Sequence, residues 1–165
     1  MTIELVNARE SEVDAAWLRN VYPLYLHDLS EYSRDMYVLN DRGEWEPDYL
    51  PSWFSEAGAY PLVICEEGVR VGFALVGRKP YPWRSSDCDQ RLSEFFILRA
   101  HRRSGIGTRA AKAVFAAFDG VWELYELPRN EAAIRFWRGV IASIAEYREQ
   151  CWPDFLRQSF RVEKK

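Results

Sequence analysis

Residues 99–108, RAHRRSGIGT, combine basic side chains with two glycines, and they lie between an apolar run and an alanine-rich amphipathic run. Glycine at positions 105 and 107 lets a ligand approach the main chain closely, and the first amide N–H groups of a following helix have no partner inside that helix. The peptide dipoles favour negative charge at such a helix start by roughly 0.3–2 kcal/mol. Further positive charge comes from Arg99, Arg102, Arg103, Arg109 and Lys112. Because no acid occurs between Glu94 and Asp119 in a chain of net charge −3, the segment predicts an anion site that a diphosphate would fit.

Two other interpretations of these glycines stay open. One is a surface helix with a glycine-rich start and a solvated basic face. The other is the dinucleotide fingerprint G-x-G-x-x-G/A, matched from Gly105 to Ala110, with Glu123 or Glu126 as the acid that binds the ribose. The dinucleotide site is disfavoured because several cations separate the glycines from the preceding strand, and because too little chain follows to build the remaining parallel units.

The strand expected over residues 91–98 carries one carboxylate, Glu94. In strand periodicity it shares a face with the apolar residues Leu92, Phe96 and Leu98. Apolar neighbours should raise its pKa toward the range useful for proton transfer. Glu94 is therefore the predicted general base, and the alternative is an edge carboxylate paired with a surface cation.

The predicted elements put these residues on one strand, one loop and one helix. Hydrophobic alternation predicts strands over residues 2–6, 62–66, 71–76, 91–98, 121–127, 146–152 and 155–162. Helical spacing predicts helices over residues 10–29, 104–118 and from Asn130 to about 140. Pro23 should break the first helix into two pieces. Residues 28–56 are acidic, aromatic and rich in loops, and residues 1–165 form a single domain because no repeat or linker divides them.

Composition narrows the function classes. Aromatic residues make up 15% of the chain and supply apolar surface for a packed core. The net charge of −3 argues against a general nucleic-acid-binding protein. The acidic start does not match a signal peptide and no apolar run approaches membrane-spanning length, so we expect a cytoplasmic protein with no membrane partner. The cysteines are odd in number and widely spaced, which predicts free thiols and no metal site. They are Cys65, Cys88 and Cys151.

The pattern Arg102-x-x-Gly105-x-Gly107, placed between EFFILRAH and a helix, resembles the R/Q-x-x-G-x-G/A motif of the GNAT acetyltransferase superfamily. The downstream stretch PRNEAAIRFWRGV resembles that superfamily's next segment, in which an Asn after a strand is followed by A-I-x-F-Y. The resemblance covers nearly the whole chain, and residues 95–137 are its specific part. It implies an α/β (α+β) acyl-CoA N-acyltransferase-like fold, with a mixed and largely antiparallel central sheet flanked by helices.

The same resemblance implies that acetyl-CoA is the acetyl donor. Loop amides would hold the pyrophosphate, and the backbone of the motif strand would pair with the pantetheine arm. The residues that it assigns to cofactor binding are Phe96, Ile97, Leu98, Arg102, Arg103, Ser104, Gly105, Ile106, Gly107, Thr108, Asn130 and Phe136. It also places Glu94 at a position from which many members draw a catalytic acidic residue.

Trp137 departs from the family pattern, because it stands where a Tyr is often proposed to protonate the leaving thiolate. An indole N–H donates a hydrogen bond but does not act as a proton-transfer acid. Tyr125 is a candidate replacement. The alternatives are a thiolate that leaves without direct protonation and a chain that has lost catalysis.

The predicted function is transfer of an acetyl group from acetyl-CoA to a primary amine of a small molecule or peptide, within a ternary complex. The acids and aromatic rings of residues 28–56 would attract and stack an ammonium group. The alternative function is a non-catalytic acyl-CoA-binding or regulatory module. The sequence leaves open which amine is the acceptor and whether the chain forms a homodimer.

Overall fold

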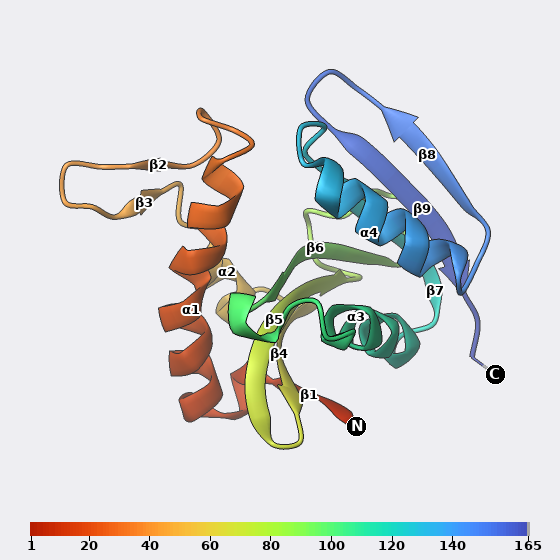
Figure 1. Cartoon of the computed structure of the whole chain (residues 1–165), viewed down its shortest axis with the longest axis horizontal. Coiled ribbons are helices and arrows are strands. Elements are labelled where there is room, and N and C mark those ends of the chain that lie inside the picture. Colours follow the sequence, from red (N-terminus) through yellow and green to blue (C-terminus); the bar gives the residue numbers. More distant parts are fainter. Residues whose placement is uncertain (165) are drawn as a thin grey trace.

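Seven strands form one sheet in the order β1-β4-β5-β6-β7-β9-β8 in the computed structural model, which describes residues 1–164 (Figure 1). In that order the strands are β1 (Ile3–Asn7), β4 (Ala59–Glu66), β5 (Val69–Arg78), β6 (Gln90–Ile97), β7 (Gly120–Glu126), β9 (Leu156–Val162) and β8 (Tyr147–Cys151). Neighbouring strands are antiparallel except β6 and β7, which run parallel. This mixed, largely antiparallel sheet confirms the predicted fold class. One parallel pair does not provide the parallel sheet of a dinucleotide-binding domain.

Helices flank both faces of the sheet. They are α1 (Glu12–Ser30), α2 (Leu50–Ser55), α3 (Ile106–Ala117) and α4 (Glu131–Ala142). The smaller elements are the 3-10 turns η1 (Ala8–Glu10) and η2 (Arg99–His101) and a hairpin of β2 (Val38–Leu39) with β3 (Trp45–Glu46). The sequence predicted the seven strands, α3 and α4 to within a few residues, but it missed α2 and the β2–β3 hairpin. Within residues 1–164, none of the helices has the length and apolar character needed to cross a membrane.

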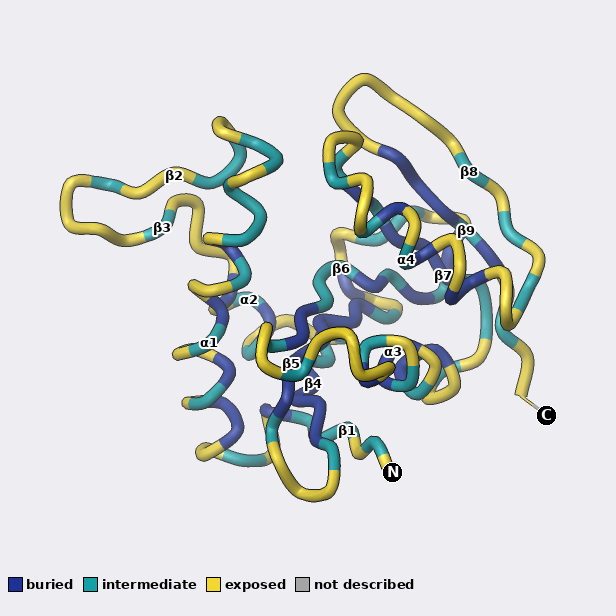
Figure 2. Tube along the Cα trace, viewed as in Figure 1, coloured by how far each residue is buried: buried dark blue, intermediate teal, exposed yellow. Residues whose placement is uncertain are grey.

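Two hydrophobic clusters cover the two faces of the sheet. On one face α3 and α4 pack against the strands, and this cluster includes Phe115 and Trp122. On the other face α1 and α2 pack against β4, β5 and β6, and this cluster includes Leu18, Phe73 and Phe96. Figure 2 shows the buried strands between the helices and the exposed outer surface of α1.

Helix α1 runs without interruption through Pro23, so the predicted break into two pieces was wrong. Proline removes one backbone hydrogen bond from a helix. Here Pro23 is exposed, whereas Leu18, Tyr22 and Leu26 are buried against the sheet on both sides of it. Burial of that continuous apolar stripe outweighs the loss of one solvent-facing hydrogen bond.

Candidate active site

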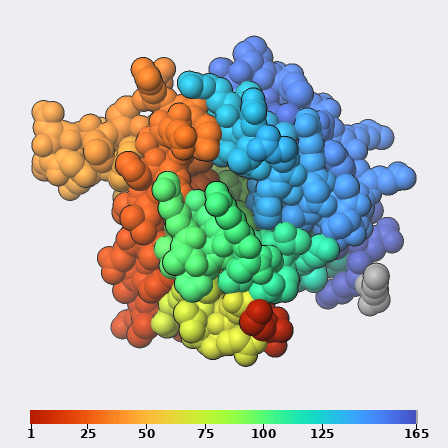
Figure 3. Space-filling view, in the orientation of Figure 1, coloured from red at the N-terminus to blue at the C-terminus, as the bar shows by residue number. Residues whose placement is uncertain are grey.

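Strands β6 and β7 part after a short parallel contact, and a cleft begins where they part. Their register pairs residues 90–92 with residues 122–124 and ends there. A cleft of about 410 Å³ continues from this point, between the free part of β6, the end of β7, α1 and α4. On the face seen in Figure 3, the surface is hollowed between the orange α1 and the cyan to blue α4.

The wall of the cleft on the α1 side is largely aromatic. Its residues from α1, α2 and the connecting loops include Tyr25, Met36, Tyr37, Tyr49, Trp53, Tyr81 and Trp83. Within residues 1–164, none of the acids of segment 28–56 lines this cleft. Asp28 binds arginines of the η2 region and Glu44 binds Arg42. Aromatic residues of segment 28–56 therefore line the cleft, and among the described residues the acids of that segment lie outside its lining.

Glu94 lies where the two strands part. Its Oε1 accepts a hydrogen bond from the Tyr22 hydroxyl at 3.2 Å, and its buried Oε2 has no partner among the described residues. Burial raises the pKa of Glu94 to about 8, while the Tyr22 hydrogen bond and the Arg91 charge act in the opposite direction. A carboxyl group with such a pKa is ionised in part near neutral pH and mostly ionised above about pH 8, and the ionised form can take up a proton.

A β-bulge in β6 turns Glu94 away from Leu92. The register with β5 shifts between Leu75, which pairs with Glu94, and Val76, which pairs with Leu92. One extra residue reverses the alternation of side chains. Leu92 therefore packs with α3 and α4, whereas Phe96 packs on the α1 side. The prediction that Glu94 shares a face with Leu92 was wrong, because pairing with β5 sets the bulge.

The loop before α3 has the geometry of an anion-binding helix start. Arg103 and Gly105 have φ angles of 63° and 80°, and no side chain of residues 1–164 caps the helix at Gly105. The first-turn amide groups therefore have no intrahelical partner. A Cβ atom at position 107 would lie 3.4 Å from the Phe136 ring, so Gly107 lets the start of α3 approach α4 closely.

Asp28, near the end of α1, binds the same loop region. Its carboxylate accepts hydrogen bonds from Arg99 Nη2 at 2.7 Å and from Arg102 Nη2 at 2.8 Å. Although burial opposes it, these two arginines hold the pKa of Asp28 below its ordinary value. Arg102 Nε also donates to the carbonyl oxygen of Ile97 at 2.7 Å. The Arg102 side chain is thus engaged with protein groups and orders the loop.

The open edge of β6 presents alternate backbone groups. The Leu98 N–H donates to the Val71 carbonyl at 2.9 Å, and the Phe96 carbonyl points toward β5. By alternation, Phe95 and Ile97 turn their backbone groups toward the cleft. Of the three predicted strand residues, only Ile97 has its backbone on the open edge. The sequence missed Phe95 because the direction of each N–H follows from the pairing.

Helix α4 supplies the opposite wall. The Asn130 side chain accepts a hydrogen bond from the Ala133 N–H at 3.1 Å, which confirms the predicted cap, and Asn130 also lines the cleft. Trp137 lines it too, and its ring centroid lies 5.1 Å from Phe95 and 4.8 Å from Phe136. Trp137 is therefore both a core residue and part of the cleft wall.

Tyr125 lines the cleft from β7, and its hydroxyl lies 3.4 Å from Ser85 Oγ and 3.5 Å from Glu123 Oε2. The Arg91 guanidinium lies 4.5 Å from its ring centroid. Adjacent residues of a strand point to opposite faces. Tyr125 therefore points away from the sheet face that α4 covers.

Glu126, the last residue of β7, lines the cleft and is only 5% exposed. Both of its carboxyl oxygens lack a hydrogen-bond partner among the described residues. Burial, with the nearby Glu149 charge, raises the pKa of Glu126 to about 8, against the opposing charge of Arg138. The sequence considered Glu126 only as a ribose-binding acid. Its place in the cleft depends on where β6 and β7 part, and no local signal predicts that point.

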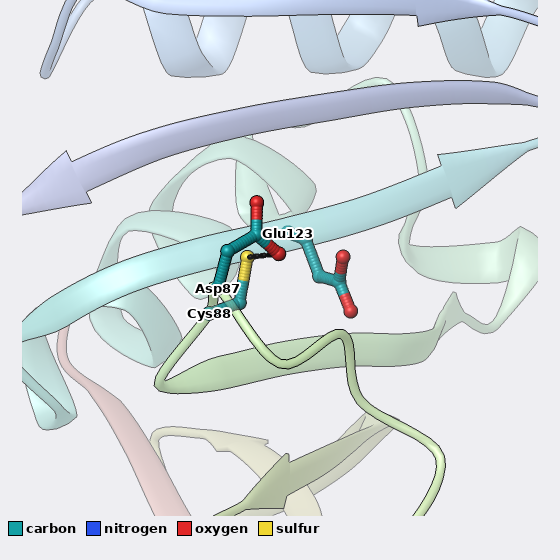
Figure 4. Close-up of side chains that lie close together, drawn as sticks. All are labelled: Asp87, Cys88 and Glu123. Atoms are coloured by element: carbon teal, nitrogen blue, oxygen red, sulfur yellow. Dashed lines mark hydrogen bonds between the residues drawn. The ribbon is translucent and has the colours of Figure 1, made fainter.

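Asp87, Cys88 and Glu123 bring potential metal-ligand atoms within 4.8 Å of one another (Figure 4). Arg157 donates to all three, from Nε to Glu123 at 2.8 Å and from Nη2 to Asp87 at 3.1 Å and to Cys88 Sγ at 3.0 Å. Burial raises the pKa of the Cys88 thiol to about 12, so it stays protonated. Because the guanidinium already supplies positive charge here, we assign the cluster the structural role of holding residues 79–89 against β7 and β9.

Solved structures of acetyltransferases resemble this chain over its full length. An acetyltransferase from Thermus thermophilus has a TM-score of 0.70 at 19% identity, over 98% of both chains. The yncA protein of Salmonella typhimurium, solved with its cofactor acetyl-CoA, has a TM-score of 0.61 at 17% identity, over 100% of this chain and 96% of that chain. The PaiA N-acetyltransferase of Thermoplasma acidophilum, solved with coenzyme A, has a TM-score of 0.56 at 12% identity, over 98% and 100%.

The sequence matches no curated protein. At these identities the solved structures establish the fold alone. The family model described as Acetyltransferase (GNAT) family matches residues 20–140, a range that contains β6, the loop before α3, and most of α4. The chain belongs to the acetyltransferase (GNAT) family.

Proposed function

We propose that this chain is an N-acetyltransferase that transfers the acetyl group of acetyl-CoA to a primary amine of a small molecule or peptide, by direct attack within a ternary complex. The observation that carries this proposal is the partly buried Glu94 carboxyl, placed where β6 and β7 part and facing a cleft between α1 and α4. Family membership supports acetyl transfer, and two structural neighbours were solved with acetyl-CoA or coenzyme A.

The chain's own groups fit the chemical parts of acetyl-CoA. The uncapped start of α3, with amides from Arg103 to Thr108, would hold the pyrophosphate. The backbone groups of Phe95 and the N–H of Ile97, whose carbonyl oxygen is bound by Arg102, would pair with the pantetheine arm, beside Asn130 and Phe136. Bound there, acetyl-CoA supplies an acetyl group activated as a thioester.

Glu94 would take the proton that the neutral amine nitrogen releases as it bonds to the acetyl carbon. A positioned base contributes about 10²–10⁴-fold to rate, and holding both reactants in one cleft contributes roughly 7 kcal/mol or more. A backbone N–H on the open edge of β6 would donate to the oxyanion that develops on the acetyl carbonyl. The base and the donor then act from the same strand.

The acceptor would enter along the aromatic wall on the α1 side. Rings such as Tyr37, Trp53 and Tyr81 line this part of the cleft. A cation over an aromatic face gains roughly 0.5–2 kcal/mol, so these rings would stabilise an arriving ammonium group without a surface acid.

Trp137 favours a second candidate, a non-catalytic acyl-CoA-binding module, because it replaces the expected hydroxyl acid. Release of coenzyme A thiol from acetyl-CoA, measured over a panel of primary amines, separates the two. Amine-dependent release supports the enzyme. Tight acetyl-CoA binding by calorimetry with no release for any amine supports the module. A thermal shift with NAD or NADP but none with acetyl-CoA overturns both.

A further inference from the structure

Glu126 is a buried carboxyl group for which the folded chain supplies no hydrogen-bond partner among the described residues. Burying a polar group without a partner costs about 1–3 kcal/mol. An apolar side chain at the end of β7 would avoid that cost, since Trp122 and Leu124 on the same face are core residues. The placement of Glu126 therefore has no explanation in stability, and its two free oxygens line the same cleft as Glu94.

We propose that Glu126 is a second catalytic residue of this cleft and that it donates a proton to the sulfur of the leaving coenzyme A. This inference rests on the proposed acetyl transfer. Glu126 is on β7 and Glu94 is on β6, the two strands that part at the start of the cleft. The two carboxyl groups thus approach the cleft from opposite strands, which suits one base and one acid.

Glu126 shares the α4 side of the sheet with the position where the family's hydroxyl acid is missing. Strand alternation puts Glu126 on the face of Leu124, which packs in the same cluster as Trp137. Tyr125 points to the opposite face, and its hydroxyl is close to Ser85 and Glu123. Glu126 therefore lies on the same side of the sheet as Trp137, which replaces the hydroxyl acid expected from the family.

Burial keeps Glu126 protonated near neutral pH. Among the described residues, the charged groups that act on it are Glu149 on β8 and Arg138 on α4, which bind each other at 2.7 Å. Their charges largely offset each other, so burial dominates and raises the pKa of Glu126 to about 8. This value is close to the value of about 8.5 expected for a thiol, which allows proton transfer between them at little cost.

The proposed step is balanced in atoms and charge. The ammonium group first loses one proton to water. The neutral amine nitrogen then bonds to the acetyl carbon, and the ionised Glu94 takes the second proton as this nitrogen releases it. As the carbon–sulfur bond breaks and its electron pair moves to sulfur, Glu126 gives its proton to sulfur. The products are the acetylated amine and coenzyme A thiol. The proton on Glu94 passes to water, and Glu126 regains one from water.

The first test needs no acceptor. The pKa of the thiol of bound coenzyme A is measured from its thiolate absorbance in the wild type and in Glu126→Gln. If Glu126 lies beside the sulfur, the two groups titrate as a pair and the thiolate forms at higher pH in the wild type than in the variant. An identical thiol pKa in both proteins would overturn the proposal, and this outcome is independent of whether any amine is acetylated.

The second test uses an amine from the panel that the wild type acetylates. We expect the kcat of the wild type to fall above about pH 8, where Glu126 loses its proton. In Glu126→Gln this fall at high pH should be absent. The variant should also turn over about 10²-fold or more slowly, with an unchanged KM for acetyl-CoA. Glu126→Asp should restore part of the rate. The control Glu146→Gln changes an exposed carboxylate and should keep the pH profile of the wild type, including the fall at high pH. If the fall of kcat at high pH survives in Glu126→Gln but vanishes in Tyr125→Phe, the proton donor to the leaving thiolate is Tyr125 and the proposal for Glu126 is rejected.

Discussion

The Tyr22 hydroxyl lies 3.2 Å from the Glu94 carboxylate and donates a hydrogen bond to it. The bond joins α1 to β6, and Glu94 but not Tyr22 lines the cleft. It favours the ionised form of the carboxyl group and therefore opposes the rise in pKa that burial causes. Tyr22 thus adjusts the proton affinity of the proposed base.

Replacing Tyr22 by Phe should raise the pKa of Glu94 above about 8. The rise of kcat/KM with pH should then begin at higher pH than in the wild type, because Glu94 must be ionised to act. The measurement is the pH dependence of kcat/KM for an acetylated amine. Tyr60→Phe, on β4, removes a hydroxyl outside the cleft and serves as the control. An unmoved acidic limb in Tyr22→Phe would contradict this role.

Glu94→Gln should lower turnover by about 10²–10⁴-fold while the affinity for acetyl-CoA is retained. The substitution keeps the size of the side chain and removes its ability to take up a proton. Turnover is measured by thiol release and affinity by calorimetry. Unchanged turnover near neutral pH would remove Glu94 from the mechanism.

Gly105→Glu should weaken acetyl-CoA binding by about tenfold or more, which corresponds to about 1.4 kcal/mol. The new side chain adds bulk and negative charge at the start of α3, where the pyrophosphate is expected. Gly43→Glu is a matched control, because Gly43 has a φ of 75° against 80° at Gly105, and it lies in the β2–β3 hairpin. Equal affinities for acetyl-CoA in the two variants would show that backbone strain, and not the site, causes any loss.

The two cleft carboxyl groups should make the wild type less stable as pH rises. Their folded-state pKa values of about 8 lie above the ordinary value of 4.5, so the folded state holds more protons between these values. Their contribution to stability is full below about pH 4.5 and is lost as pH rises through about 8. Glu126→Gln removes one such group. Its Tm relative to the wild type, measured by calorimetry, should therefore rise between about pH 4.5 and about pH 8, and a constant difference would contradict the raised pKa.

Arg157→Met should destabilise the fold by about 3–5 kcal/mol, because Glu123 is fully buried and would lose its cation. Chemical denaturation measures this loss. The double variant Arg157→Met with Glu123→Leu should recover much of it, since no uncompensated charge is then buried. Chelation with EDTA should leave the Tm of the wild type unchanged. A drop in Tm on chelation would mean that a metal ion, and not Arg157, holds this cluster together.

The sequence predicted those features that depend on neighbouring residues. The spacing of Gly105 and Gly107 after a basic run predicted the uncapped helix start, and Asn130 predicted the cap of α4. Most strands were found because their apolar runs are short and bounded by turn residues.

Features that depend on contacts between distant segments could not be predicted. The bulge beside Glu94 arises from pairing with β5, and the continuity of α1 through Pro23 arises from packing on the sheet. Glu126 enters the cleft only because β6 and β7 part before it. Arg157 forms an ion pair with Asp87, from which it is separated by 70 positions in the sequence, and no short motif predicts such a contact.

The parting of β6 and β7 divides the sheet into two halves, and within residues 1–164 their strand pairing is confined to residues 90–92 and 122–124. Residues 79–89 brace this junction, because Asp89 binds the backbone of Val121 through its own N–H and its carboxylate, and Ser85 binds Glu123. The cleft is lined from both halves of the sheet, so the angle at which the braced junction holds the two halves sets the width of the cleft.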